Sequence, residues 1–143
     1  MALKNLCRLS RDKTGLAALE FAVLAPALLM LVFSVIVYSI YFTALYGVRQ
    51  ASSEGARAAL AGLSSTERST LATARAQTVA ESFRSIVGQG HSFVVTTQSE
   101  SSDVFAVTVS YDMSGSPIMR YAGFLPLPST TVSATTRVTN GSY

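Results

Sequence analysis

The chain has 143 residues, of which 49% are hydrophobic and only 13% are charged, so one domain is expected, and part of it must be unusually apolar. Its net charge is +3 at pH 7, yet the first 14 residues carry four basic side chains against one acidic side chain, which accounts for the whole excess. The balanced remainder excludes the broad basic surface of a nucleic-acid-binding protein. A single cysteine, Cys7, excludes an intrachain disulfide and a cysteine metal cluster.

A basic leader, residues 1–15, precedes a long apolar segment. No charged residue occurs from Phe21 to Tyr46, a run of 26 residues. As a helix with a rise of ~1.5 Å per residue this run measures about 39 Å, enough to cross a hydrocarbon core of ~30 Å. It is too long for the ~7–15-residue apolar core of a secretory signal peptide. We therefore predict a transmembrane helix at residues 16–47, with the clustered cations of the leader in the cytoplasm.

Two features inside this segment carry further predictions. Pro26 removes one backbone donor and predicts a kink or loosening of the helix upstream. Three tyrosines gather toward the far end, as in the aromatic belt of a membrane interface. They are Tyr38, Tyr41 and Tyr46.

The helix is expected to continue beyond the membrane. Val48–Leu63 contains many alanines and no proline, and Gly62 provides a stop. Glu54 and Arg57 are three residues apart, so they lie on one face of this helix. Residues 48–143 are predicted to form an extracytoplasmic α+β domain.

A second, amphipathic helix follows. Ser64 and Glu67 have the spacing of a capping box, which predicts the helix start. Gly88 and Gly90 predict its end. The apolar residues expected on one stripe of this helix are Leu71, Val79, Phe83, Ile86 and Val87.

Beyond residue 90 the apolar pattern alternates, which predicts strands. In Val104–Tyr111 the side chains of Phe105, Val107 and Val109 share one face, as in a half-buried strand. The other expected segments are a strand at Phe93–Thr97, a turn at Gln98–Asp103, an irregular stretch at Asp112–Pro128 and a strand at Thr130–Val138. The predicted fold class is α+β, with the long helix, the amphipathic helix and a small antiparallel sheet of about three strands.

The head of the apolar segment carries the main functional signal. Glu20 begins a transmembrane run, where a carboxylate costs ~2.5–3.5 kcal/mol even on permissive insertion scales. A cut between Gly15 and Leu16 would create an α-amine that Glu20 of a neighbouring subunit can pair with. Gly15 suits the cut, because a residue without a side chain lets a protease approach the backbone. The alternative is that Glu20 simply lies at the interface, in a first helical turn that favours acidic residues.

The segment Arg11–Pro26 (RDKTGLAALEFAVLAP) resembles the N-terminus of TadE-like minor pilins, or pseudopilins, of the tight-adherence (Flp, type IVb) pilus systems. The segment Ala51–Arg57 (ASSEGAR) resembles the short polar motif that follows the span in this family. The late stretches VTVSYDMSG, from Val107, and TTVSATTRV, after Pro128, are similar to its C-terminal pattern. The resemblance covers most of the chain weakly and is specific near Gly15–Phe21 and Glu54–Arg57.

This resemblance implies cleavage after Gly15 by a prepilin peptidase. It implies that Glu20, followed by Phe21, is the glutamate of the family motif. It also implies that Glu54, Gly55 and Arg57 form the motif after the membrane, and that the protein helps to assemble an adhesive fibre. Two residues depart from the family pattern, because Thr14 and Ser53 stand where basic residues are common.

We therefore expect a structural subunit of the bacterial inner membrane, with the N-terminus in the cytoplasm and the domain outside. Its expected partners are the prepilin peptidase, other pilin subunits, inner-membrane pilus assembly proteins and the lipid bilayer. The alternative is an uncleaved, membrane-anchored protein-binding module. An enzyme is a distant third reading, because His91 is the only histidine and no nucleophile motif occurs. No cofactor, metal, nucleic acid or small-molecule substrate is expected.

Overall fold

The computed structural model describes residues 13–88, 91–101, 103–121, 123, 126 and 129–139. Most of the predicted leader, with Cys7, lies outside the described residues, as do Gly90, which is predicted to end the second helix, and Pro128, the end of the predicted irregular stretch. Contacts divide the chain into two units, Met1–Ile36 and Val37–Tyr143.

The first element, α2, is a helix of 47 residues from Lys13 to Ala59. It passes through Pro26 without ending. Three backbone bonds close the turn after it, from Leu60 N–H to Arg57 O, from Ala61 N–H to Ala58 O and from Gly62 N–H to Ala59 O. Within the described residues, its portion Gly15–Ala59 is the one helix whose length and composition suit a membrane crossing. The prediction of one long apolar helix that continues beyond residue 47 is confirmed.

The second helix, α3, runs from Ser65 to Ser82 and begins at the predicted capping box. The backbone N–H of Glu67 donates to Ser64 Oγ at 3.2 Å. The Glu67 carboxylate reaches back one residue further than expected and accepts from Leu63 N–H at 2.9 Å. One backbone donor of the first turn and one just before the N-cap are thereby satisfied.

The predicted apolar stripe of the second helix is partly wrong. The side of α3 that is buried consists of Ala72, Ala76 and Ala80, whereas Leu71 and Ile86 are exposed. The helix ends at Ser82, and Phe83 separates it from a short helix α4, Arg84–Val87, so Ile86 is not in register with α3. Alanines lie inside because α3 packs too closely on its neighbours for larger side chains.

Among the other stripe residues, Val87 is buried, and Val79 and Phe83 are partly buried against the core. Gly88 ends α4 at a φ of 100°, a conformation that side chains disfavour, which confirms the predicted stop.

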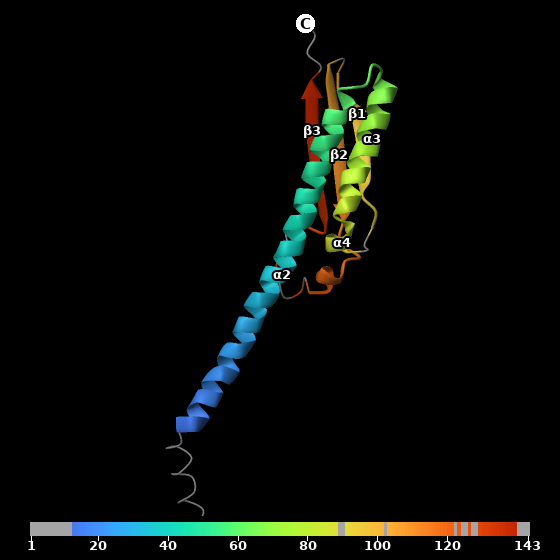
Figure 1. Ribbon diagram of the computed structural model, residues 1–143. Coiled ribbons are helices and arrows are strands. Elements are labelled where there is room, and N and C mark those ends of the chain that lie inside the picture. The colour runs from blue at the N-terminus through green and yellow to red at the C-terminus, as the bar shows by residue number, and fades with distance from the viewer. Residues whose placement is uncertain are drawn as a thin grey trace, which may run out of the picture. The chain divides into compact units, whose positions relative to one another are not determined.

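Three antiparallel strands form one sheet in the order β1-β2-β3, namely β1 Val94–Ser99, β2 Val104–Asp112 and β3 Thr131–Thr139 (Figure 1). The register pairs Val95 with Val109 and Val109 with Ala134. A short 3-10 helix, η1, occupies Pro117–Tyr121 in the stretch predicted as irregular.

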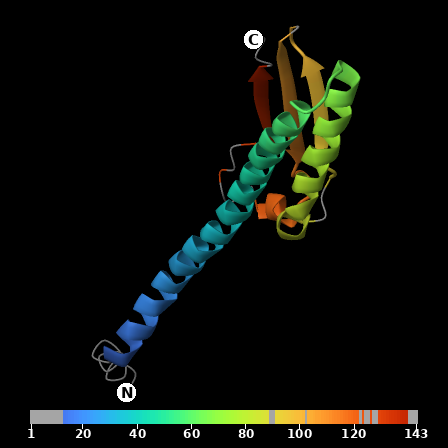
Figure 2. The same ribbon diagram turned by 45° about the horizontal axis from the view of Figure 1, so that its top comes forward.

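The core of the second unit lies between the sheet and the helices. Phe105, Val107, Val109 and Tyr111 of β2 are buried on the face that both helices cover (Figures 1 and 2). The predicted inward face of this strand is thus confirmed. The ring of Tyr111 stacks on Phe93 with centroids 4.5 Å apart. These features confirm the predicted α+β class.

Candidate functional site

The N-terminal motif lies on α2 in the unit Met1–Ile36. Gly15 and Leu16 are both helical, so the bond proposed for cleavage is inside a helix. A Cβ built on Gly15 meets no atom within 4 Å, among those described. The described fold therefore does not require glycine at position 15. Any requirement for glycine there must come from outside the described fold.

Glu20 is exposed on α2 and lies four residues after Leu16, a rise of about 6 Å along the helix. Its surroundings on the helix surface are apolar and also exposed, including Leu16, Leu19 and Phe21. A carboxylate on such a surface is costly in hydrocarbon unless a cation pairs with it. The geometry therefore leaves Glu20 available to a group outside the described fold.

The second motif lies in the unit Val37–Tyr143 and joins two helices. Arg75 Nη2, on α3, lies 3.1 Å from Glu54 Oε2, and Arg57 Nη1 lies 3.7 Å from Glu54 Oε1. The Glu54 side chain keeps 29% of its surface exposed. The Arg75–Glu54 ion pair therefore contributes at most about 1 kcal/mol to stability. The sequence predicted the Glu54–Arg57 pair but missed Arg75, because no spacing rule relates residues on different helices.

Gly55 allows α2 to approach α3 and β2 closely. A Cβ on Gly55 would lie 3.0 Å from Ala72 O, 3.0 Å from Ala76 Cβ and 3.2 Å from Val107 Cγ1. One helical position therefore contacts both α3 and β2, and only a residue without a side chain fits there without displacement.

Ser52 fixes the same helix to the sheet. Its side chain is fully buried, and its Oγ lies 2.9 Å from Thr136 Oγ1 on β3. It also donates to Arg49 O at 3.0 Å. The polar segment after the apolar run, with Ser52, Glu54, Gly55 and Arg57, therefore acts as the packing joint of the second unit.

Replacing Gly55 tests this role. We expect Gly55→Leu to destabilise the second unit by about 2 kcal/mol, because an overpacking cost of up to ~3 kcal/mol outweighs the gain of ~1 kcal/mol in helix propensity. Thermal unfolding followed by circular dichroism in detergent measures the change. Gln50→Leu, at an exposed position of the same helix, is the matched control and should change stability by less than ~0.5 kcal/mol. Equal melting temperatures for the two variants would contradict the assignment.

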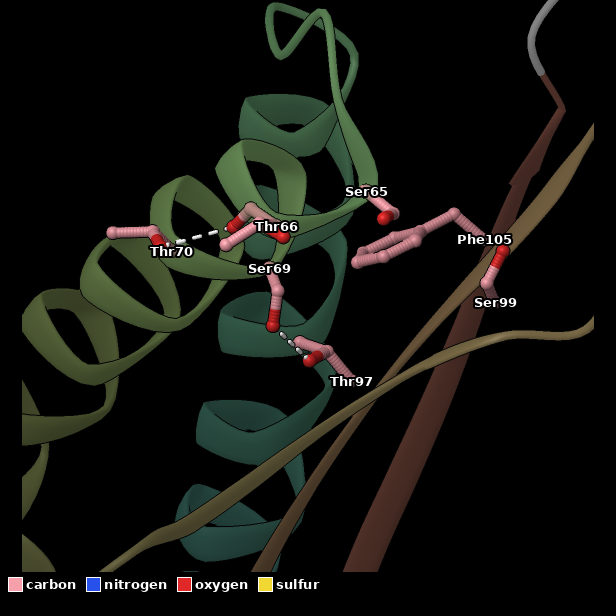
Figure 3. Close-up of a pocket in the computed structure, with 7 residues that line it drawn as sticks. All are labelled: Ser65, Thr66, Ser69, Thr70, Thr97, Ser99 and Phe105. Atoms are coloured by element: carbon pink, nitrogen blue, oxygen red, sulfur yellow. Dashed lines mark hydrogen bonds between the residues drawn. The ribbon is translucent and has the colours of Figure 1, made fainter.

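A hydroxyl-lined groove of about 380 Å³ lies between α3 and β1 (Figure 3). Several of its hydroxyls have partners within the fold: Ser69 Oγ lies 2.6 Å from Thr97 Oγ1, and Thr70 donates to Thr66 O at 3.0 Å. Phe105 of β2 also lines the groove, with its ring directed toward Ser65. The Ser69–Thr97 bond ties α3 to β1, whereas the Thr70–Thr66 bond lies within α3, so the groove is best explained as part of the packing.

The described chain is an α+β protein with one candidate membrane-spanning helix. Residues 15–57 match the family described as TadE-like protein, and over this range the resemblance to that family is confirmed. The match begins at Gly15 and ends at Arg57, so it contains both motifs and suggests involvement in a tight-adherence pilus system. Comparisons with curated proteins and with solved structures give no match.

Proposed function

We propose that this chain is a minor pilin-like, or pseudopilin-like, structural subunit of a tight-adherence pilus system, processed after Gly15 in the bacterial inner membrane. The observation that carries the proposal is the family match from Gly15 to Arg57 on one continuous helix. That helix bears the exposed carboxylate of Glu20 at the head of its apolar surface. Its partners would be a prepilin peptidase, other pilin subunits and inner-membrane assembly proteins.

The membrane-spanning part of α2 is proposed to be residues 16–36. These 21 residues correspond to about 31 Å of helix, close to a hydrocarbon core of ~30 Å. Their large apolar side chains are exposed on the surface of the helix. From Val37 onward the helix belongs to the second unit, and Val37, Tyr41, Ala44 and Val48 are buried there. The proposed span is therefore shorter than the 16–47 segment expected from hydropathy.

Cleavage and assembly are proposed to be coupled through one charge pair. The cut removes the cytoplasmic cations and gives Leu16 a free α-amine. Glu20 of a neighbouring subunit then supplies the carboxylate that neutralises this amine inside the membrane. Neither charge is stable alone in hydrocarbon, so the pair favours association of processed subunits.

The N-terminus of the mature protein tests the proposal directly. We expect N-terminal sequencing of protein from its native membrane to begin at Leu16. An intact N-terminus would instead favour the alternative function, an uncleaved membrane-anchored module that binds a partner protein.

The proposed orientation gives a further prediction. A reporter fused after Tyr143 should be active only if it works outside the cytoplasm, because the cations before Gly15 hold the N-terminus inside. Parallel fusions to an enzyme that folds outside the cytoplasm and to one active only within it measure the orientation. Activity of the cytoplasmic reporter at this position would reverse the topology.

A further inference from the structure

The part of α2 that belongs to the second unit carries an exposed stripe of side chains. Because a helix turns by about 100° per residue, four of them lie within an arc of about 60° and a fifth lies beside it. The four are Tyr46, Gln50, Ser53 and Arg57, and the fifth is Arg49. Tyr46 is 61% exposed, and the Arg57 side chain is 75% exposed. We call these five residues the outer stripe of α2.

The spacing along the outer stripe is that of a contact between helices. Tyr46, Gln50, Ser53 and Arg57 follow one another at intervals of four, three and four residues. A helix that packs along a second helix repeats its contact residues at these intervals. Tyrosine and arginine are also the residues that contribute most often to the centre of protein interfaces.

Contacts within the fold explain little of this stripe. Arg57 Nη1 approaches Glu54 Oε1 only to 3.7 Å, and its side chain forms no hydrogen bond within the described residues. In the same part of the chain, the exposed side chain of Arg49 has no ion-pair partner. Tyr46 meets Phe83 edge-on, with ring centroids 6.0 Å apart, and keeps most of its surface free.

The outer stripe and its surroundings carry an excess of positive charge. Glu54 makes its shorter contact, 3.1 Å, with Arg75 of α3, the helix that lies beside α2 over the sheet (Figure 2). Three arginines therefore share one carboxylate here, which leaves two positive charges in excess. A guanidinium presents its N–H donors in a planar fork that matches a carboxylate. The complementary group for Arg49 and Arg57 is therefore a carboxylate from another molecule.

Two other occupants fit this surface less well. Two copies of the outer stripe facing each other would bring arginines of equal sign together, which is unfavourable. Anionic lipid headgroups attract clusters of about 4–8 basic residues, whereas this surface has an excess of two charges and includes Glu54. A protein helix that carries carboxylates matches both the charge and the spacing.

We propose that the outer stripe of α2 packs against a helix of another protein subunit, with carboxylates of that helix opposite Arg49 and Arg57. The proposal rests on the function proposed above, a structural subunit of an assembly. It adds a contact that lies in the second unit and is separate from the charge pair of Glu20. Tyr46 supplies the apolar part of this contact, and the arginines select an acidic partner.

A single introduced lysine tests the contact, because the only lysines of the chain are Lys4 and Lys13. Both are replaced by arginine, which keeps the charge of the leader. Arg49→Lys and Arg57→Lys then each place one side-chain amine on the outer stripe without changing its charge. A carbodiimide joins such an amine to a carboxylate that it contacts, and adds no spacer. Native membranes that contain the other subunits are treated with this reagent.

Gln77→Lys is the matched control. Gln77 is exposed on α3 and lies about 160° around that helix from Arg75, so its lysine points away from the outer stripe. The control protein has every other amine in common with the two test variants. Immunoblots detect adducts, and mass spectrometry of digested adducts identifies the coupled residue.

We expect Arg49→Lys and Arg57→Lys to give several-fold more adduct with a second protein than Gln77→Lys, joined through Asp or Glu. Salt at about 1 M before coupling should reduce this adduct, because it screens exposed charges. The proposal is overturned if neither variant exceeds the control. Coupling to the carboxylate of phosphatidylserine, or to Glu54 of a second copy, also overturns it.

The same immunoblots show whether residues 1–15 are lost, so the two proposals are tested separately. An uncleaved chain that still forms the adduct would contradict processing after Gly15 and support the contact of the outer stripe. A cleaved chain that forms no adduct above the control would support processing and overturn the contact.

Discussion

Gly15→Leu is expected to abolish maturation, so that the full-length protein, with residues 1–15 still attached, accumulates in the membrane. The structure shows open space around Gly15, so leucine does not disturb the chain itself. The block would arise at the peptidase. A leucine side chain shields the Gly15–Leu16 bond, and it also stabilises the helix that must unwind before that bond can enter an active site. Glycine weakens a helix interior by ~1 kcal/mol relative to alanine, and leucine restores most of this.

Two variants separate these contributions. Gly15→Ala favours the helix but adds only a methyl group, so it should slow cleavage less than leucine does. Ala18→Leu adds a similar side chain three residues beyond the site and should be inserted and cleaved normally. Immunoblots of membrane fractions, with mass determination of the product, distinguish the two forms. A Gly15→Leu protein that matures to the same mass as the unaltered chain would place the cut elsewhere.

The elements that the sequence predicted well are those determined by neighbouring residues. The cap at Ser64 depends on a hydroxyl and a carboxylate three residues apart, and the inward face of β2 depends on strict alternation. The stop at Gly88 depends on a single backbone conformation. Each of these signals acts within one turn or one strand, so no knowledge of the partner elements is needed.

The features that were missed depend on contacts between elements. Hydropathy identified Leu71 as an inward residue, yet the close approach of α3 places Ala72 and Ala76 inside instead. Arg75 meets Glu54 from another helix, and Ser52 meets Thr136 from a strand 84 residues later. Small or hydroxyl-bearing residues give a weak hydropathy signal, although their size decides how closely two elements pack.

The N-terminal motif and the polar motif after the apolar run also differ in whether contacts within the chain explain their residues. Gly55 is explained by the atoms of this chain, because three of them lie within 3.2 Å of where its Cβ would be. Gly15 and Glu20 have no such explanation in the described residues. Gly15 has open space around it, and Glu20 is exposed. A motif that the isolated fold does not need is a candidate for contact with another molecule, and this contrast makes Glu20 the decisive residue to alter.

Glu20→Ala is expected to leave insertion and cleavage nearly unchanged and to abolish association with other subunits. Removing the carboxylate eases entry of the helix into hydrocarbon, because a charge there costs ~2.5–3.5 kcal/mol. In an assembly, however, the α-amine of Leu16 would lose its partner. Breaking a buried pair by removing one member costs ~3–5 kcal/mol, equivalent to a loss of association of roughly a hundredfold or more.

Co-purification of the cleaved variant with its native partners measures this loss. Glu20→Asp keeps the charge on a shorter side chain and should recover part of the association, whereas Glu20→Gln keeps the size without the charge and should not. If Glu20 merely lies at the interface, all three variants should co-purify as well as the unaltered chain, because a solvated carboxylate contributes little. Undiminished recovery of Glu20→Ala would therefore remove the charge pair from the mechanism and leave the glutamate as an ordinary residue of a helix start.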